Sequence, residues 1–167
     1  MGHIEHKQHA KEGVKCAVLT VSDSRTKEND DSGRLIMRSL EESNHKVLFY
    51  DILIDDRGVL EKTVSELISN PDVEAIITNG GTGVSKRDIT IEVVSGFIEK
   101  ELVGFGELFR FLSYREIGSS AIMSRALAGV CNGKIIISLP GSMNAVKLGM
   151  EEIINPELGH MVWEVNR

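Results

Sequence analysis

Short apolar segments alternate with amphipathic segments along most of the chain, and this alternation limits the possible folds more than any other feature. The apolar segments have the length of buried strands, whereas the segments between them place apolar residues at helical spacing. Such alternation is typical of an α/β fold in which helices cover both faces of a mostly parallel sheet. We expect strands at 15–21, 46–54, 74–78 and 134–139, and helices at 33–43, 58–69, 90–100, 107–118, 119–130, 142–154 and 156–163.

The length of 167 residues fits one domain of ordinary size. Residues 1–13 are polar and lack periodicity, so we expect a flexible tail followed by a single domain spanning 14–167. His3, His6 and His9 recur at every third position of this tail, and a metal site there would need a helix to align them. Nothing in the tail caps such a helix, which favours solvent-exposed histidines.

The charge balance is acidic, with 19 Lys and Arg against 25 Asp and Glu and a formal net charge of −6. Binding to nucleic acid or to an anionic membrane needs clustered positive charge, so both functions are disfavoured, whereas one local cationic pocket stays compatible with the composition. No apolar run approaches the length of a membrane-spanning helix, about 20 residues, and the N-terminus lacks an apolar signal segment. Cys16 and Cys131 show no CxxC spacing, which favours reduced thiols and a cytoplasmic location.

The strongest functional signal is a glycine-rich loop after the third expected strand. The segment Gly80–Gly83 (GGTG) has three glycines in four residues, so its backbone N–H groups can approach an anion closely. The helix expected next directs its positive end toward the same point. The spacing matches neither the P-loop nor the Rossmann fingerprint. Lys86 and Arg87 add positive charge, so the loop predicts a phosphate-type anion site, with a tight strand-to-helix turn as the alternative.

Polar loops also follow the other expected strands. In doubly wound sheets, ligands bind beyond the carboxyl ends of the strands, near the point where the strand order reverses. Ser22-Asp23-Ser24, Asp55-Asp56 and Pro140-Gly141-Ser142 follow the first, second and fourth strands. We therefore expect these loops to meet the glycine-rich loop at one edge of the sheet, although the strand order itself does not follow from the pattern.

Two of these loops carry carboxylates, Asp88 in the glycine-rich loop and Asp55-Asp56 after the second strand. Carboxylate and phosphate oxygens are the usual ligands of Mg²⁺, which predicts a metal–phosphate site. Helix capping is the alternative for both loops, with Asp88 or Thr90 as the cap of helix 90–100, and the two roles are compatible. No histidine or cysteine lies in these loops, which disfavours zinc and Ser-His or Cys-His catalysis. Nucleotidyl transfer to a phosphate needs mainly positioning, Mg²⁺ and charge neutralisation, and it fits better than hydrolysis.

Short motifs of loop residues are spread over most of the chain. They are VSD at 21–23, TNGGTG at 78–83, RDIT at 87–90, GFGE at 104–107, SRA at 124–126 and LPGS at 139–142. In combination these motifs resemble the MogA/MoaB family of molybdenum cofactor biosynthesis, and most of all its MoaB branch. The resemblance implies a three-layer α/β/α molybdopterin-binding fold. It also implies adenylylation of molybdopterin with Mg-ATP, giving molybdopterin-AMP and pyrophosphate, and assembly as a homotrimer or hexamer.

The resemblance implies roles for individual residues. The two essential aspartates of the family correspond to Asp55 and Asp88, which would be the catalytic residues and the Mg²⁺ ligands. Ile54 stands where the family often has proline, so Asp56 stays open as an alternative to Asp55. The expected ligand-binding residues are Ser22, Asp23, Ser24, Asn79, Gly80, Gly81, Thr82, Gly83, Lys86, Arg87, Pro140, Gly141 and Ser142.

One departure from the family pattern keeps a second function open. Ser142-Met143 follow Pro140-Gly141, where the adenylylating MogA branch often has an Asn-Pro or Gln-Pro pair. Some MoaB-type proteins are not active adenylyltransferases, so the alternative is a non-catalytic molybdopterin-binding or assembly protein. The sequence leaves open which loop binds the pterin and which the nucleotide, and whether the pathway uses molybdenum or tungsten.

An aromatic cluster carries the only sequence signal for oligomerisation. Phe105, Phe109, Phe111 and Tyr114 lie within ten residues of one another. Such a cluster suits a subunit interface, and ordinary core packing is the alternative.

Overall fold

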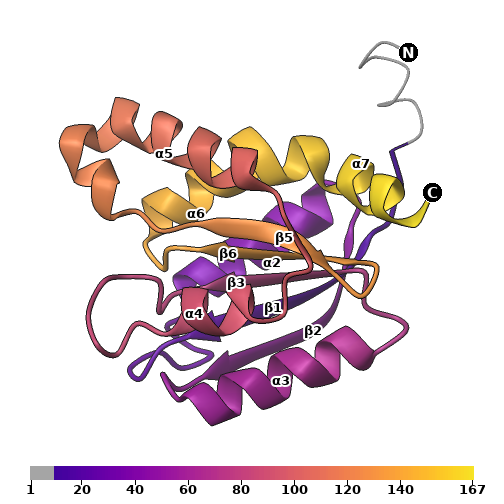
Figure 1. The fold of residues 1–167 in the computed structure, drawn as a ribbon, viewed down its shortest axis with the longest axis horizontal. Coiled ribbons are helices and arrows are strands. Elements are labelled where there is room, and N and C mark those ends of the chain that lie inside the picture. The colour runs from indigo at the N-terminus through magenta and orange to yellow at the C-terminus, as the bar shows by residue number, and fades with distance from the viewer. Residues whose placement is uncertain (1–9) are drawn as a thin grey trace.

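The computed structural model describes residues 10–167 and contains a six-stranded sheet with the order β2-β1-β3-β6-β5-β4, flanked by helices (Figure 1). The elements are β1 Lys15–Val21, α2 Asp31–Glu42, β2 Lys46–Leu53, α3 Arg57–Ser69, β3 Ala75–Asn79, α4 Thr90–Ser95, β4 Lys100–Glu101, α5 Val103–Ile117, the 3₁₀ helix η1 Gly118–Met123, β5 Leu127–Cys131, β6 Lys134–Leu139, α6 Met143–Gly149, the π-helical segment η2 Met150–Ile154 and α7 Asn155–Asn166. Strands β2, β1, β3 and β6 are parallel, whereas β5 and β4 are antiparallel to their neighbours.

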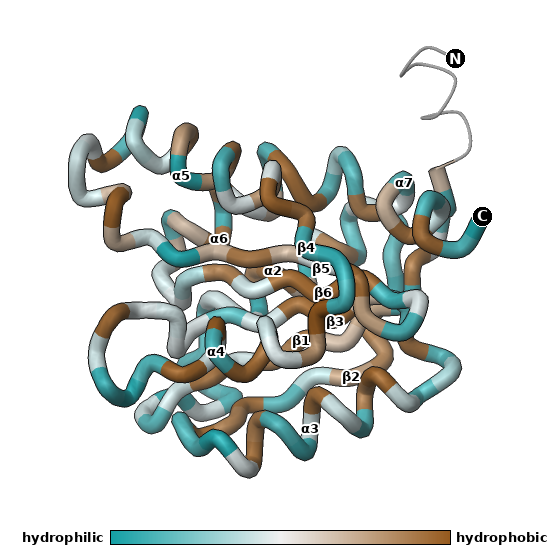
Figure 2. The backbone as a smooth tube through the Cα atoms, in the orientation of Figure 1, coloured by the Kyte–Doolittle hydropathy of each residue, from teal (hydrophilic) through white to brown (hydrophobic). Residues whose placement is uncertain are grey.

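Helices cover both faces of the sheet, which confirms the predicted three-layer α/β/α arrangement with a mostly parallel sheet. Successive residues of a strand point to opposite faces. In β1, Cys16 and Val18 join the core under α2, α5, α6 and α7, whereas Ala17 and Leu19 join the core under α3 and α4. Hydrophobic residues, coloured brown in Figure 2, are frequent along the central strands. Because both faces of the central strands are buried, their sequences are continuous apolar runs.

The prediction of a helix at 119–130 is wrong. Residues 118–123 form the 3₁₀ helix, and 127–131 form β5, which pairs with β6 in an antiparallel hairpin. The turn of this hairpin is Asn132-Gly133, with φ of 47° and 72°. Asn-Gly with two positive φ values is the strongest short hairpin signal, and it outweighs the apolar spacing that had suggested a helix.

Two further expectations around α4 are also wrong. The helix expected at 90–100 ends at Ser95, and Lys100–Glu101 instead pair with β5 as a short edge strand. Neither Asp88 nor Thr90 caps α4, because the N-cap position is Ile89 and no side chain caps the helix. The Thr90 hydroxyl instead donates to the carbonyl oxygen of Gly80.

The aromatic cluster is divided between the core and the surface. Phe105 and Phe109 are buried in the core under α5, whereas Phe111 and Tyr114 are 56% and 61% exposed. Helical spacing explains the division, because residues four apart share a face and their neighbours turn away from it. The second pair remains available for contacts with another molecule.

Residues 1–9, which include His3, His6 and His9 of the predicted tail, lie outside the described residues. Within 10–13, the Lys11 backbone N–H donates to the Gly159 carbonyl oxygen at 3.0 Å, and the Lys11 ammonium pairs with Glu74. In the part of the chain that the structure describes, no helix has both the length and the hydropathy to cross a membrane.

Candidate functional site

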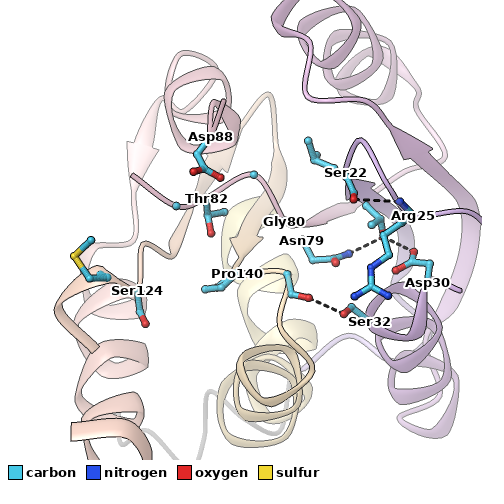
Figure 3. Close-up of a pocket in the computed structure, with 16 residues that line it drawn as sticks. Ser22, Arg25, Asp30, Ser32, Asn79, Gly80, Thr82, Asp88, Ser124 and Pro140 are labelled. Carbon is cyan, nitrogen blue, oxygen red and sulfur yellow. Dashed lines mark hydrogen bonds between the residues drawn. The ribbon is translucent and has the colours of Figure 1, made fainter. Parts of the chain in front are cut away.

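A cavity of about 360 Å³ lies at the carboxyl ends of β1 and β3 (Figure 3). These strands are adjacent, and the strand order reverses between them, because β2 lies beyond β1 and β6 lies beyond β3. Doubly wound sheets bind ligands at this position. The cavity is lined by Thr20, Val21, Ser22, Arg25, Asp30, Ser32, Asn79, Gly80, Gly81, Thr82, Gly83, Asp88, Met123, Ser124, Pro140 and Gly141.

Two glycines allow the glycine-rich loop to pass close to β1. Gly80 and Gly81 have φ of 89° and 62°, in the left-handed region that other residues rarely adopt. A Cβ atom at Gly80 would lie 2.3 Å from the carbonyl oxygen of Val21. Thr90 anchors the loop, because its N–H donates to the Gly81 oxygen and its hydroxyl to the Gly80 oxygen, both at 2.9 Å. The loop is therefore held between β1 and the start of α4 at one wall of the cavity.

Asp88 presents an ionised carboxylate at the end of this loop. The Ser85 N–H and hydroxyl donate to Asp88 Oδ2 at 2.9 Å and 2.6 Å. The Ser85 hydroxyl is the largest influence that holds the pKa of the Asp88 carboxyl below its ordinary value, and burial opposes it. The backbone amides of Ser85 and Gly83 lower this pKa further. Asp88 is therefore preorganised in its charged form.

Asp55 contributes a second carboxylate from the end of β2. Its Oδ1 is buried and lacks a hydrogen-bond partner among residues 10–167. The same oxygen would lie 2.9 Å from a Cβ atom at Gly81, which places Asp55 against the glycine-rich loop. Burial raises the pKa of the Asp55 carboxyl, and the charges of Asp23 and Asp88 raise it further. Asp55 and Asp88 are thus close enough for their charges to interact.

The pair formed by Asp55 and Asp88 fits a divalent cation that also binds phosphate. Within the described residues, no group of three or more His, Cys, Asp or Glu is placed to hold a metal ion by itself. Mg²⁺ commonly takes one or two carboxylates and completes its shell with phosphate and water oxygens. Asp56 has a different role, because its Oδ1 accepts from the Val59 N–H at 2.9 Å as the N-cap of α3. A cation would stabilise the unpartnered, buried oxygen of Asp55.

A chain of hydrogen bonds orients Asn79 at the inner end of the cavity (Figure 3). Asn79 Nδ2 donates to the Leu19 carbonyl oxygen at 3.3 Å and to Thr20 Oγ1 at 2.9 Å, and the Thr20 hydroxyl donates to Asp30 Oδ2 at 2.6 Å. Because the Leu19 carbonyl can only accept, the orientation of the Asn79 amide is determined. Its Oδ1 is buried and has no partner in the described chain. The cavity therefore offers an acceptor for an N–H group of a ligand.

Comparisons with known proteins identify the family of this chain. The family described as "Probable molybdopterin binding domain" matches residues 17–160. Molybdenum cofactor biosynthesis protein B from Bacillus cereus is 49% identical, over 100% of this chain and 99% of the relative. The protein of the same name from Bacillus subtilis is 49% identical, over 98% and 96% of the two chains.

The chain belongs to the molybdopterin-binding family. It is a MoaB-type protein of molybdenum cofactor biosynthesis, as its motifs predict. Solved structures agree, since a crystal structure of molybdenum cofactor biosynthesis protein B superposes with a TM-score of 0.91 at 49% identity, covering 95% of this chain and 99% of that one. The tungsten cofactor synthesizing protein MoaB from Pyrococcus furiosus has a TM-score of 0.86 at 38% identity, covering 95% and 100%.

In this molybdopterin-binding domain, most of the predicted ligand-binding residues line one cavity. They are Ser22, Asn79, Gly80, Gly81, Thr82, Gly83, Pro140 and Gly141, together with the predicted metal ligand Asp88. Two others, Asp23 and Ser24, do not line the cavity but contact neighbouring site residues. Asp23 Oδ1 accepts from the Asp55 N–H at 3.0 Å, and the Ser24 N–H donates to Ser22 Oγ at 3.2 Å.

Asp55, the other predicted metal ligand, does not line the cavity, and neither do Lys86, Arg87 and Ser142. Lys86 and Arg87 are exposed on the loop, and Arg87 Nη1 lies 3.6 Å from Asp23 Oδ2. Ser142 caps α6, where its Oγ accepts from the Ala145 N–H at 3.3 Å. Ser142 also lines a neighbouring cavity of about 320 Å³, which shares Ser124 and Pro140 with the first one.

Three cavity residues that the sequence did not indicate are Arg25, Asp30 and Ser32, which lie between the strand expected at 15–21 and the helix expected at 33–43. Asp30 is fully buried and accepts from the Gly33 N–H at 3.0 Å as the N-cap of α2. An aspartate before an amphipathic helix is a recognisable cap signal, so this residue could have been found. Nothing local indicates that the Arg25 guanidinium lies at a cavity, since that depends on how the segment folds back over β1.

Proposed function

We propose that the protein transfers the adenylyl group of Mg-ATP to the phosphate of molybdopterin, forming molybdopterin-AMP and releasing pyrophosphate. The observation that carries this proposal is the pair of carboxylates beside the glycine-rich loop, in which Asp88 is charged and Asp55 retains one buried oxygen without a partner. Membership of the molybdopterin-binding family supports the pterin as one substrate.

The proposed reaction depends on positioning and charge neutralisation. An oxygen of the ionised pterin phosphate attacks the α-phosphorus of ATP, and the bond to the bridging oxygen breaks with its electron pair, which leaves on pyrophosphate. The nucleophile carries no proton at the attacking oxygen, so no general base is needed. Asp55 and Asp88 would hold Mg²⁺, which supplies neutralisation of the triphosphate charge. Arg25 and the amides of the glycine-rich loop would bind phosphate oxygens.

Two adjoining cavities support a reaction of two substrates. The larger one contains the glycine-rich loop and Asp88, and the smaller one, lined by Ser142, joins it at Ser124 and Pro140. In the larger cavity, the free acceptor of Asn79 suits an N–H donor, which the heterocycles of both substrates carry. This arrangement leaves room for a pterin and a nucleotide to meet near Asp88.

An adenylylation assay tests the proposal. Purified protein is incubated with molybdopterin and Mg-ATP, and molybdopterin-AMP is measured by mass spectrometry. Asp55→Asn and Asp88→Asn should each lower the rate by about 100-fold or more, because each removes one charge from the proposed metal site. Asp56→Asn is the matched control, since asparagine caps helices about as well as aspartate and the rate should stay near that of the wild type.

The assay also separates catalysis from binding alone. Ser142 caps α6 and does not line the larger cavity, and Ser142-Met143 stand where the adenylylating branch often has an Asn-Pro or Gln-Pro pair, which supports the binding-only alternative. If the wild-type protein binds molybdopterin but forms no product with Mg-ATP, the catalytic proposal fails, and the protein is a molybdopterin-binding or assembly protein. Full activity of Asp88→Asn would also refute the assignment of that residue.

We further propose that the protein forms a homotrimer or hexamer through the exposed apolar surface of α5 and η1. This surface combines Phe111 and Tyr114 with Ile117, Ile122 and Met123, of which Ile122 is 83% exposed. Exposed apolar patches that contain aromatic residues are typical of subunit interfaces. Met123 also lines the larger cavity, so this interface would lie next to the proposed substrate site.

We place the proposed reaction in the cytoplasm, with a pterin and a nucleotide as its partners and no role for nucleic acid or a membrane. Both cysteines are free and buried, in accordance with a reducing compartment. Burial, with a contribution from the charge of Glu74, raises the pKa of the Cys16 thiol to about 12, so that thiol is unreactive. The net charge of −6 opposes general binding to polyanions.

A further inference from the structure

Arg125 holds the glycine-rich loop from outside the cavity lining. It lies between η1 and β5, and its guanidinium Nε and Nη2 donate to the carbonyl oxygens of Thr82 and Gly83 at 2.8 Å and 2.6 Å. The same guanidinium donates to both carboxylate oxygens of Glu92 on α4, at 3.2 Å to Oε2. The Arg125 side chain is 30% exposed and does not line the cavity. One planar guanidinium therefore binds the Thr82 carbonyl, the Gly83 carbonyl and the Glu92 carboxylate, and Arg125 lines neither of the two adjoining cavities.

The peptide between Thr82 and Gly83 lies between Arg125 and Asp88. The described chain contains no cis peptide, and in a trans peptide the carbonyl and the N–H point in opposite directions. Because the Thr82 carbonyl faces Arg125, the Gly83 N–H must face the other side of the loop. Asp88 lies directly against Gly83, because a Cβ atom at Gly83 would lie 2.7 Å from Asp88 Oδ2, and the Gly83 amide helps to lower the pKa of the Asp88 carboxyl. Arg125 and Asp88 thus both contact the Thr82–Gly83 segment, Arg125 at its two carbonyl oxygens and Asp88 beside Gly83.

We propose that Arg125, fixed by Glu92, is a positioning residue that sets the orientation of the Thr82–Gly83 peptide and through it the place of the Asp88 carboxylate. The proposal rests on the proposed function, in which Asp88 is a metal ligand. Arginine suits this role because its fork of donors satisfies several acceptors in one plane. Lysine keeps the charge but is a point donor on a flexible stem, so it cannot hold two carbonyls and a carboxylate in the same geometry.

Arg125→Lys and Glu92→Gln test the proposal, with Arg34→Lys as a matched control. Arg34 also binds two loop carbonyls, those of Lys27 and Glu28 at 2.9 Å, and one carboxylate, that of Asp31 at 2.6 Å. Its loop carries neither Asp55 nor Asp88 but does carry Arg25, so Arg34→Lys is the control for exchange at 82–88 and not for kcat. For each variant of the full chain, we would measure amide hydrogen exchange of residues 82–88, together with kcat and KM for Mg-ATP in the adenylylation assay.

The expected result combines a local structural effect with a catalytic one. Exchange at 82–88 should accelerate in Arg125→Lys and Glu92→Gln but not in Arg34→Lys. The value of kcat should fall by about 10- to 100-fold in the first two variants, because displacement of a catalytic group by about 1 Å costs on that order. The value of KM should change by less than about threefold, as expected when alignment and not substrate binding is lost.

Two outcomes overturn the proposal. Unchanged exchange at 82–88 in both variants would show that Arg125 does not hold the loop, whatever the activity. Accelerated exchange with wild-type kcat would show that the contact is only structural. Failure of the proposed function is distinguishable from both, because it would appear as absence of product in the wild-type protein. In that case accelerated exchange would still support positioning of the loop.

Discussion

Substitution of Gly81 by alanine is expected to destabilise the protein and to disturb the proposed site. The φ of 62° at Gly81 costs an alanine about 1–2 kcal/mol. Its Cβ atom would lie 2.4 Å from Thr90 Oγ1, which must move away from the carbonyl oxygen of Gly80, and the lost hydrogen bond adds about 1 kcal/mol. The sum of about 2–3 kcal/mol corresponds to a fall in Tm of about 6–9 °C for a chain of this size.

Gly104→Ala is the matched control for this prediction. Gly104 lies in α5, and a Cβ atom there would meet nothing within 4 Å. Alanine at this helical position should therefore stabilise the protein by about 0.5–1 kcal/mol. Thermal unfolding followed by circular dichroism compares the two variants directly. If Gly81→Ala and Gly104→Ala shift Tm equally, the reasoning about the strained glycine-rich loop is refuted.

The activity of Gly81→Ala gives a second, independent test. The same Cβ atom would lie 2.9 Å from Asp55 Oδ1, so it displaces a proposed metal ligand as well as the loop. The rate of adenylylation should therefore fall at temperatures where the variant is still fully folded. A folded variant with the wild-type rate would show that the position of Asp55 relative to the loop is unimportant.

Three further predictions concern charge, buried hydrogen bonds and assembly. The fold raises the pKa of the Asp55 carboxyl, so stability is lost as the pH rises through the folded-state pKa. Asp55→Asn should therefore increase the free energy of unfolding in urea near neutral pH but not at a pH below the ordinary pKa of aspartate. Equal increases at the two pH values would refute this. Thr20→Val should cost about 1–3 kcal/mol in the same assay, because Asp30 and Asn79 each lose a buried partner, and a neutral effect would contradict it. Phe111→Glu should lower the mass in light scattering to that of a monomer, whereas an unchanged oligomer would exclude this surface as the interface.

Several elements could be predicted because their signals are local. The strands at 15–21 and 134–139 were predicted at the residues where the structure has them. Short apolar runs between polar segments are typical of buried strands. Strand β5 was missed because its five residues, LAGVC, are small and apolar and show no period that distinguishes a strand from a helix. Only the Asn132-Gly133 turn and the pairing with β6 decide between them.

The candidate site shows the same division. The sequence identified the glycine-rich loop and the aspartates, because glycine at positive φ and carboxylates at strand ends are readable from residue type and spacing. It left Asp55 and Asp56 undecided. The structure separates them, since Asp56 caps α3 whereas Asp55 faces the loop with an unpartnered oxygen. The position of Arg25 at the cavity likewise could not be predicted from the sequence, because it depends on contacts between distant segments.

The sequence by itself determined the α/β class, the edge of the sheet where the loops converge and the types of side chain that those loops carry. These follow from backbone geometry, because the carboxyl ends of parallel strands must emerge on the same edge. The tertiary structure alone decided which carboxylate is buried, which amide is locked by its neighbours and which arginine holds the loop. Burial and electrostatic interaction depend on groups brought together from far apart in the chain, and local patterns do not encode those distances.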